Sequence, residues 1–209
     1  MKLLDGFHDM AGGYTLSAHM AQHMFVALVL APLLLLCVPS QVAWKAATGA
    51  VVRRLLRVLR RRRLTWLIGI GAMWFWQLPV ICEAAMRRPA LHTVESVCFL
   101  LTGAIFWWPI VSPVPRERME PVPWAVLYLF SACLGCSVLG ILIAFAQPGM
   151  GHTRLADQQI AGLVMWVGGC FVYLSAIMAM FARWYNTSEE TVPAFAPDPM
   201  AITEVSSVE

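Results

Sequence analysis

Residues 123–146 read PWAVLYLFSACLGCSVLGILIAFA, an uninterrupted apolar stretch without a charged side chain. A helix needs roughly 20 apolar residues to cross the ~30 Å hydrocarbon core of a bilayer, so this stretch predicts a transmembrane helix. Four further apolar stretches surround it, at about 16–39, 65–85, 91–110 and 158–182. We therefore expect an all-α fold, a polytopic membrane helix bundle of about five transmembrane helices.

The composition agrees with this reading, because 59% of the 209 residues are hydrophobic and only 13% are charged. Such a chain is far more apolar than a typical soluble domain. The bundle is predicted over residues 1–185, and residues 186–209, which are acidic and contain proline, are predicted to be a disordered cytoplasmic tail. No catalytic triad, phosphate-binding loop or nucleotide motif is evident, so we expect a protein that is not an enzyme.

Positive charge is concentrated between the first two predicted spans, in Lys45, Arg53, Arg54, Arg57 and the run from Arg60 to Arg63. Such an excess marks a cytoplasmic loop, which predicts an extracytoplasmic amino terminus and a cytoplasmic carboxyl terminus. With this topology 11 of the 15 Lys and Arg residues lie inside. We expect the loop to contact anionic lipids, and no nucleic acid, since aromatic interleaving and a known binding fold are missing.

The first residues lack a basic region ahead of the first apolar stretch, which predicts that the first span is an uncleaved anchor. The six cysteines are not spaced like a disulfide framework. Cys82 and Cys98 are candidates to supply a thiolate at the outer end of the spans. Cys133 and Cys136 form a C-x-x-C within an apolar helix, where small packing residues are the more common interpretation.

All five histidines fall on the extracytoplasmic side of this topology: His8, His19, His23, His92 and His152. His19 and His23 are one helical turn apart and share a face, and Met20 and Met24 share the adjacent face. Two imidazoles in this arrangement can bind one metal ion, and thioethers favour Cu(I). The candidate metal ligands are therefore His19, His23, His92, Met20 and Met24. The alternative is that the histidines hydrogen-bond within the bundle and the methionines only pack.

Three carboxylates lie at the same ends of the predicted spans: Glu83, Glu95 and Asp157. Glu95 shares a helix face with His92, and a carboxylate there can accept the proton of a ligating imidazole. We expect all three to support the metal ligands. The alternatives are an ion pair with Arg87 or Arg88 for the glutamates, and capping of the last span's amino terminus for Asp157.

Four segments in order carry a family resemblance: HMAQHM at 19–24 with APL at 31–33, WQLP at 76–79, LHTVE at 91–95 with FWWP at 106–109, and DQQIAGLVMW at 157–166. Together they resemble the cytochrome c oxidase assembly factor family CtaG. The resemblance covers most of the predicted membrane part. This chain has Gln77 and Ser96 at two positions where the family pattern tends to have histidine, which makes it a divergent member.

The resemblance implies a multi-pass protein of the bacterial cytoplasmic (inner) membrane that assists assembly of a haem-copper oxidase. It implies copper, as Cu(I), bound at the outer face by a cluster of His19, His23, His92, Glu95 and Asp157. Oxidase subunits and periplasmic copper chaperones are the expected partners. Two alternatives stay open: a haem-binding electron-transfer protein with axial histidines from two spans, and a metal-free scaffold for oxidase subunits.

Overall fold

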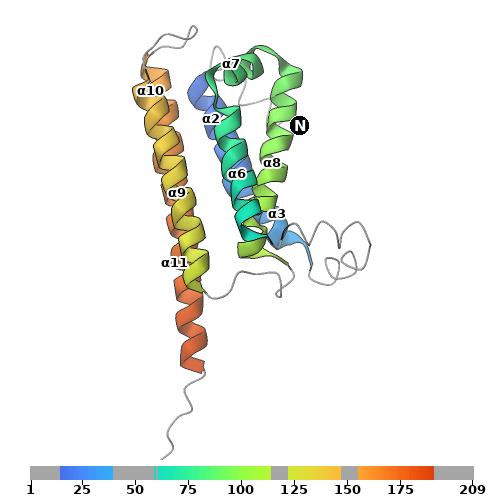
Figure 1. Ribbon diagram of the computed structural model, residues 1–209, viewed down its shortest axis with the longest axis vertical. Helices are drawn as coiled ribbons and strands as arrows, with labels where there is room; N and C mark the ends of the chain where they lie inside the picture. The colour runs from blue at the N-terminus through green and yellow to red at the C-terminus, as the bar shows by residue number, and fades with distance from the viewer. Residues whose placement is uncertain (1–14, 40–58, 60, 114–121, 147–154, 191–209) are drawn as a thin grey trace, which may run out of the picture.

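The computed structural model describes residues 15–39, 59, 61–113, 122–146 and 155–190, and every element within these ranges is a helix (Figure 1). Four helices are long and apolar enough to cross a membrane, or up to five if a bent pair counts as one span. The all-α fold class and the expected number of spans are thus confirmed. The side of the membrane on which each end lies remains a prediction.

The first span is a continuous helix, Leu16–Cys37, built from α2 (Leu16–Phe25), the π-helix η1 (Val26–Leu30) and α3 (Ala31–Cys37). The Thr15 side chain caps its amino terminus by accepting a hydrogen bond from Ala18 N. In η1 the Ala31 N–H donates to Val26 O, five residues back. Proline lacks an N–H group and disturbs the preceding helical turn, and Pro32 lies two residues after the end of this π-helix.

The second span is broken, in contrast to the single stretch 65–85 that the sequence predicts. Helices α6 (Arg62–Trp76) and α7 (Pro79–Arg87) meet at an angle of 70°. Leu78 between them has φ −59° and ψ 129°, because a residue before proline is sterically disfavoured in the helical region. Pro79 then begins α7, where its missing N–H group has no consequence. The sequence therefore encodes both the break and the restart.

The remaining spans are α8 (Pro89–Val111), α9 (Val122–Phe145) and a long helix made of α10 (Leu155–Leu163), the π-helix η3 (Val164–Gly168) and α11 (Gly169–Glu190). Helix α11 extends beyond the predicted end of the span at 182, so residues 186–190 are helical. Residues 191–209 lie outside the described part of the chain.

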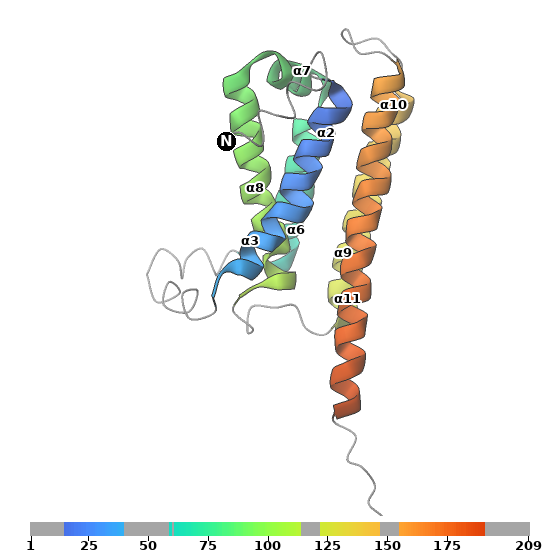
Figure 2. The same ribbon diagram turned by 180° about the vertical axis from the view of Figure 1, so that it is seen from behind.

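The helices form two groups. Helices α9, α10 and α11 make an antiparallel hairpin, and the first span, α6 and α8 lie beside it (Figures 1 and 2). The first span packs against α8 through η1 and α3, and α2 packs against α10. Within the hairpin the backbones touch, because a Cβ atom built on Gly162 would lie 2.5 Å from Gly140 O. Small residues permit such close helix packing in membranes.

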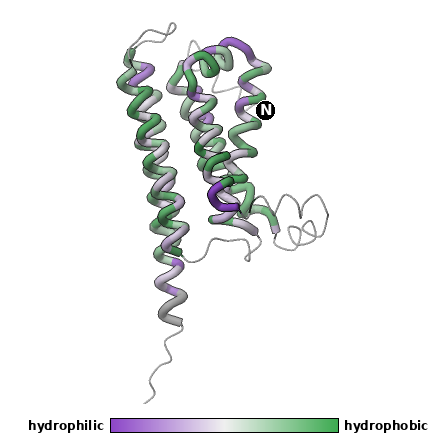
Figure 3. The backbone as a smooth tube through the Cα atoms, viewed as in Figure 1, coloured by the Kyte–Doolittle hydropathy of each residue, from purple (hydrophilic) through white to green (hydrophobic). Residues whose placement is uncertain are grey.

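Polar residues gather at the two ends of the bundle and apolar residues cover the length between them (Figure 3). The exposed arginines Arg61, Arg62 and Arg63 lie at the start of α6, at one end. Helix α7 and the first turns of α2 and α10 lie at the opposite end (Figure 1). The fold therefore brings the predicted outer ends of the spans together.

Candidate metal centre

A cluster of four ligand-type side chains lies near the end of the bundle that holds α7. His19 and His23 come from α2, and His92 and Glu95 come from α8. Each offers one nitrogen or oxygen atom, and these four atoms all lie within 4.8 Å of one another. Two helices that are distant in sequence therefore build one site.

The carboxylate of Glu95 is the common contact in this cluster. Its Oε2 lies 3.5 Å from His19 Nε2 and 3.3 Å from His23 Nε2. The ring centroids of His19 and His23 are 4.3 Å apart, and each is 5.2 Å from the His92 ring. All three imidazoles are thus in contact with each other around one carboxylate.

Burial of the Glu95 carboxylate among these histidines costs free energy unless a positive charge balances it. The relative exposure of His19 and Glu95 is 0%, and that of His23 is 2%. An ionised carboxylate within a transmembrane bundle is costly unless it pairs with a cation. A protonated imidazole or a metal ion would both supply that charge. His92 is only partly buried, so it marks the more accessible side of the cluster.

The distances suit a single small metal ion. Two donors bound at ~2.1 Å in a tetrahedron lie about 3.4 Å apart, which matches the separations of 3.5 and 3.3 Å between Glu95 and the two imidazoles. Three imidazoles and one carboxylate form a donor set that copper, zinc and iron accept. Two of the separations therefore match a shared metal ion, and all four ligand atoms lie within 4.8 Å of one another.

Local sequence explains how the four side chains converge. His19 and His23 are one turn apart on α2, and His92 and Glu95 are three residues apart on α8, so each helix presents a pair on one face. Lower down, Gly103 lets α8 approach η1, since a Cβ there would lie 2.8 Å from Ala27 O. Close packing of these two helices brings the two pairs together.

Asp157 does not join the cluster but holds the helix that carries it. Its carboxylate accepts hydrogen bonds from Leu16 N at 2.8 Å, Ser17 N at 3.2 Å and Ser17 Oγ at 2.5 Å. The sequence suggested that Asp157 caps the span that it begins. Instead its side chain caps the amino terminus of α2, beside the positive end of that helix dipole, and so fixes α10 to the first span.

Other predicted residues lie apart from the cluster. Glu83 on α7 forms an ion pair with Arg87 one turn away, at 2.5 Å, and both side chains are substantially exposed. Neither Cys82 nor Cys98 belongs to the ligand group found among the described residues. The bend between α6 and α7 explains why Glu83 lies apart from the cluster, because it turns α7 away from the axis of the second span. His8 and His152 lie outside the described residues.

The two predicted methionine ligands have different surroundings. Met20 is 2% exposed, and its Sδ accepts a hydrogen bond from Gln77 Nε2 at 3.0 Å. Met24 lies one turn further along α2 and lines a cavity below the histidines. Gln77 was not among the predicted ligands, although the family resemblance marked it as a position where histidine is typical.

Comparison with known proteins supports the family resemblance that the four sequence motifs carry. A family model described as cytochrome c oxidase caa3 assembly factor (Caa3_CtaG) matches residues 3–187, which confirms the family resemblance. An uncharacterized protein of Mycobacterium leprae is 25% identical over 202 residues. Uncharacterized proteins of Mycobacterium bovis and Mycobacterium tuberculosis are each 23% identical over 212 residues. These matches cover 83% of this chain and 30% of each relative, so the chain spans about a third of their length. No solved structure matches the chain significantly.

Proposed function

The chain belongs to the family of cytochrome c oxidase caa3 assembly factors, and on that premise we propose that it binds copper at the extracytoplasmic end of its bundle and delivers it to an oxidase subunit. The observation that supports this proposal is the cluster of His19, His23, His92 and Glu95, whose ligand atoms lie within 4.8 Å of one another. Copper is the cargo in this proposal, and the chain's own residues hold and release it.

Charge balance favours Cu(I) as that cargo. Glu95 is the one carboxylate in the group, and its single negative charge neutralises a monovalent ion. A divalent ion would leave net positive charge at a buried position in the membrane, which is costly. Imidazole nitrogens are suitable ligands for copper, and His19, His23 and His92 supply them.

Release is proposed to begin at His92. This residue is partly buried, whereas His19 and His23 are almost fully buried. An incoming ligand from an oxidase subunit would replace His92 first, because that side of the ion is the most accessible. The two imidazoles of α2 then follow by successive ligand exchange, so that copper is never released into water.

The remaining partners follow from the predicted topology. Periplasmic copper chaperones are the proposed donors, since the cluster lies at the end opposite Arg61, Arg62 and Arg63. Those three exposed arginines are proposed to contact anionic lipids of the cytoplasmic leaflet. In this proposal the protein resides in the bacterial inner membrane.

Two alternatives are less well supported. A haem protein would place axial histidines on opposite sides of a porphyrin, but the three imidazole rings here pack against each other at 4.3 to 5.2 Å. A metal-free scaffold would have no need for a buried carboxylate facing three imidazoles. An optical spectrum of the purified protein tests the first alternative directly, because a Soret band would reveal haem.

Metal analysis tests the proposal itself. Detergent-purified wild-type protein and the variant His19→Ala/His23→Ala are loaded with Cu(I), passed through a desalting column and analysed for copper. We expect bound copper in the wild type and a large loss in the variant. In cells, the same variant should reduce the amount of assembled oxidase. Equal copper content in the two proteins would reject the ligand assignment.

A further inference from the structure

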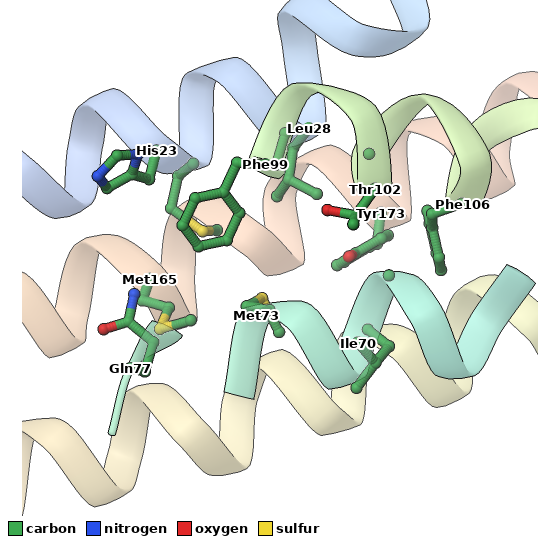
Figure 4. A pocket seen from close by; sticks show the side chains of 14 residues that line it. His23, Leu28, Ile70, Met73, Gln77, Phe99, Thr102, Phe106, Met165 and Tyr173 are labelled. Atoms are coloured by element: carbon green, nitrogen blue, oxygen red, sulfur yellow. The ribbon is translucent and has the colours of Figure 1, made fainter. Parts of the chain in front are cut away.

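A cavity of about 30 Å³ lies directly below the histidine cluster, and His23 forms part of both. Three methionines from three different segments line it: Met24 of α2, Met73 of α6 and Met165 of η3. Figure 4 shows Met73 and Met165 reaching toward each other from their helices, with Phe99 and Tyr173 nearby. The proposed copper site thus continues into a space bordered by thioethers.

The helix geometry around this cavity is unusual. Both π-helices found among the described residues contribute to its wall, η1 through Ala27 and Leu28 and η3 through Met165. π-Helical turns are rare and often occur at functional sites. Two of them, on separate spans, border the same small volume. This coincidence indicates that the space has a use beyond ordinary packing.

We propose that this cavity is a second, inner site for a soft monovalent metal ion, held by the thioethers of Met24, Met73 and Met165. The inference rests on the proposed function for the route of entry, because the ion would pass from the histidine cluster through His23. The inner site then holds a second ion in the apolar part of the bundle.

The chemistry of the lining selects the ion. Thioether sulfur is a neutral, soft ligand that prefers Cu(I) over hard cations. The cavity lining contains no carboxylate, so a bound ion keeps its full charge there, and a monovalent ion costs less free energy than a divalent one. The rings of Phe99, Phe106 and Tyr173 also line the space, and aromatic faces attract cations. A space of about 30 Å³ is large enough to admit a bare ion.

The competing explanation is that these methionines only fill space, as methionine often does in irregular cores. Leucine separates the two explanations, because Met→Leu keeps the side-chain volume approximately constant and removes the sulfur. The variant Met73→Leu/Met165→Leu therefore tests ligation with little effect on packing. Met178→Leu is the matched control, since Met178 is 67% exposed on the outside of the bundle.

The experiment is an anaerobic titration of the detergent-purified full chain with Cu(I) against a chromophoric Cu(I) chelator, followed by copper X-ray absorption. The outer site is removed separately with His19→Ala/His92→Ala, because neither residue lines the cavity. We expect the wild type and Met178→Leu to bind two ions per chain. The histidine variant should retain one ion with sulfur ligands, and the methionine variant one ion with nitrogen and oxygen ligands only.

The outcomes separate the two proposals. If Met73→Leu/Met165→Leu binds as much Cu(I) as the wild type with an unchanged absorption spectrum, the inner site is wrong and the outer site stands. If the histidine variant keeps full binding while the methionine variant loses it, the outer assignment is wrong and the inner site stands. If the double variant folds poorly, the single variants Met73→Leu and Met165→Leu repeat the test. Each is expected to weaken binding of the sulfur-bound ion at least tenfold.

Discussion

Glu95 Oε2 lies 3.3 Å from His23 Nε2, and both side chains are almost completely buried between α8 and α2. This contact joins two spans that are separated in sequence by an entire helical pair. A buried carboxylate beside an imidazole has a large energetic effect in a membrane. The contact is therefore the first place to test what the cluster does.

Replacing Glu95 with glutamine keeps the shape of the side chain and removes its charge. We expect Glu95→Gln to weaken Cu(I) binding by roughly 10- to 100-fold, the range seen when a group that supports metal ligands is changed. A chelator competition assay measures the change. Glu83→Gln is the control, because Glu83 pairs with Arg87 outside the cluster, and it should leave the affinity unchanged. Equal effects of the two variants would contradict the structural assignment.

Copper binding should depend on pH, because an imidazole must be deprotonated to bind a metal. Protons compete with the ion more strongly as the pH falls. Copper content should therefore be complete near pH 7.5 and decline by about pH 5.5, across the range in which histidine changes its charge. Equilibrium dialysis at stepped pH values measures this directly. Copper retained unchanged at the lower pH would argue against histidine ligands.

Asp157→Ala removes the acceptor for three hydrogen bonds at the amino terminus of α2. Loss of such a cap costs about 1–2 kcal/mol, so the midpoint of thermal unfolding in detergent should fall. Copper binding should persist at low temperature, since Asp157 is outside the ligand group. Gln159→Ala, an exposed change on the same helix, should leave the midpoint in place. A large loss of copper without loss of stability would show that Asp157 acts on the metal.

Gly162→Ala should disturb the α9–α10 hairpin. The added Cβ would lie 2.5 Å from Gly140 O and 2.6 Å from Ala144 N, so the backbones must separate. Overpacking of this kind costs about 1–3 kcal/mol. Gly71→Ala is the matched control, because a Cβ on Gly71 meets nothing within 4 Å, and it should not destabilise the protein. Thermal unfolding of the two variants side by side provides the measurement.

Thiol labelling tests the predicted orientation. Cys37 is exposed at the end of the first span, on the side where the arginines of α6 lie. If the basic loop is cytoplasmic, a membrane-impermeant maleimide should label Cys37 only after the cells are permeabilised. Cys37→Ser should abolish that labelling. Efficient labelling of Cys37 in intact cells would show that the predicted orientation is wrong and that the histidine cluster lies on the cytosolic side.

The helices and the pairing of histidines were predictable because both depend on short-range sequence. Apolar length specifies a span, and four-residue spacing places His19 and His23 on one face. The Leu78-Pro79 pair explains where the second span breaks, although the single stretch predicted at 65–85 did not indicate a bend of 70°. Local rules therefore recover the elements and the pairs of ligands within each element.

Contacts between helices were not predictable in the same way. Sequence placed Glu95 and Glu83 at similar depths, and only packing decides that Glu95 faces α2 while Glu83 turns outward on α7. Asp157 shows the same limit, since its spacing fitted a cap of its own helix and the structure directs it to Leu16 and Ser17. Such choices depend on which helices are neighbours, and a single sequence does not encode that in any local pattern.

The bend at Leu78 also has a consequence for the surrounding lipid. Helix α6 has 15 residues before the break, which at ~1.5 Å per residue gives about 22 Å, less than the ~30 Å of an average hydrocarbon layer. A short hydrophobic segment thins the bilayer around it. We therefore expect headgroups and water to approach along this flank, which would bring the imidazoles closer to the aqueous phase than a full-length span would place them.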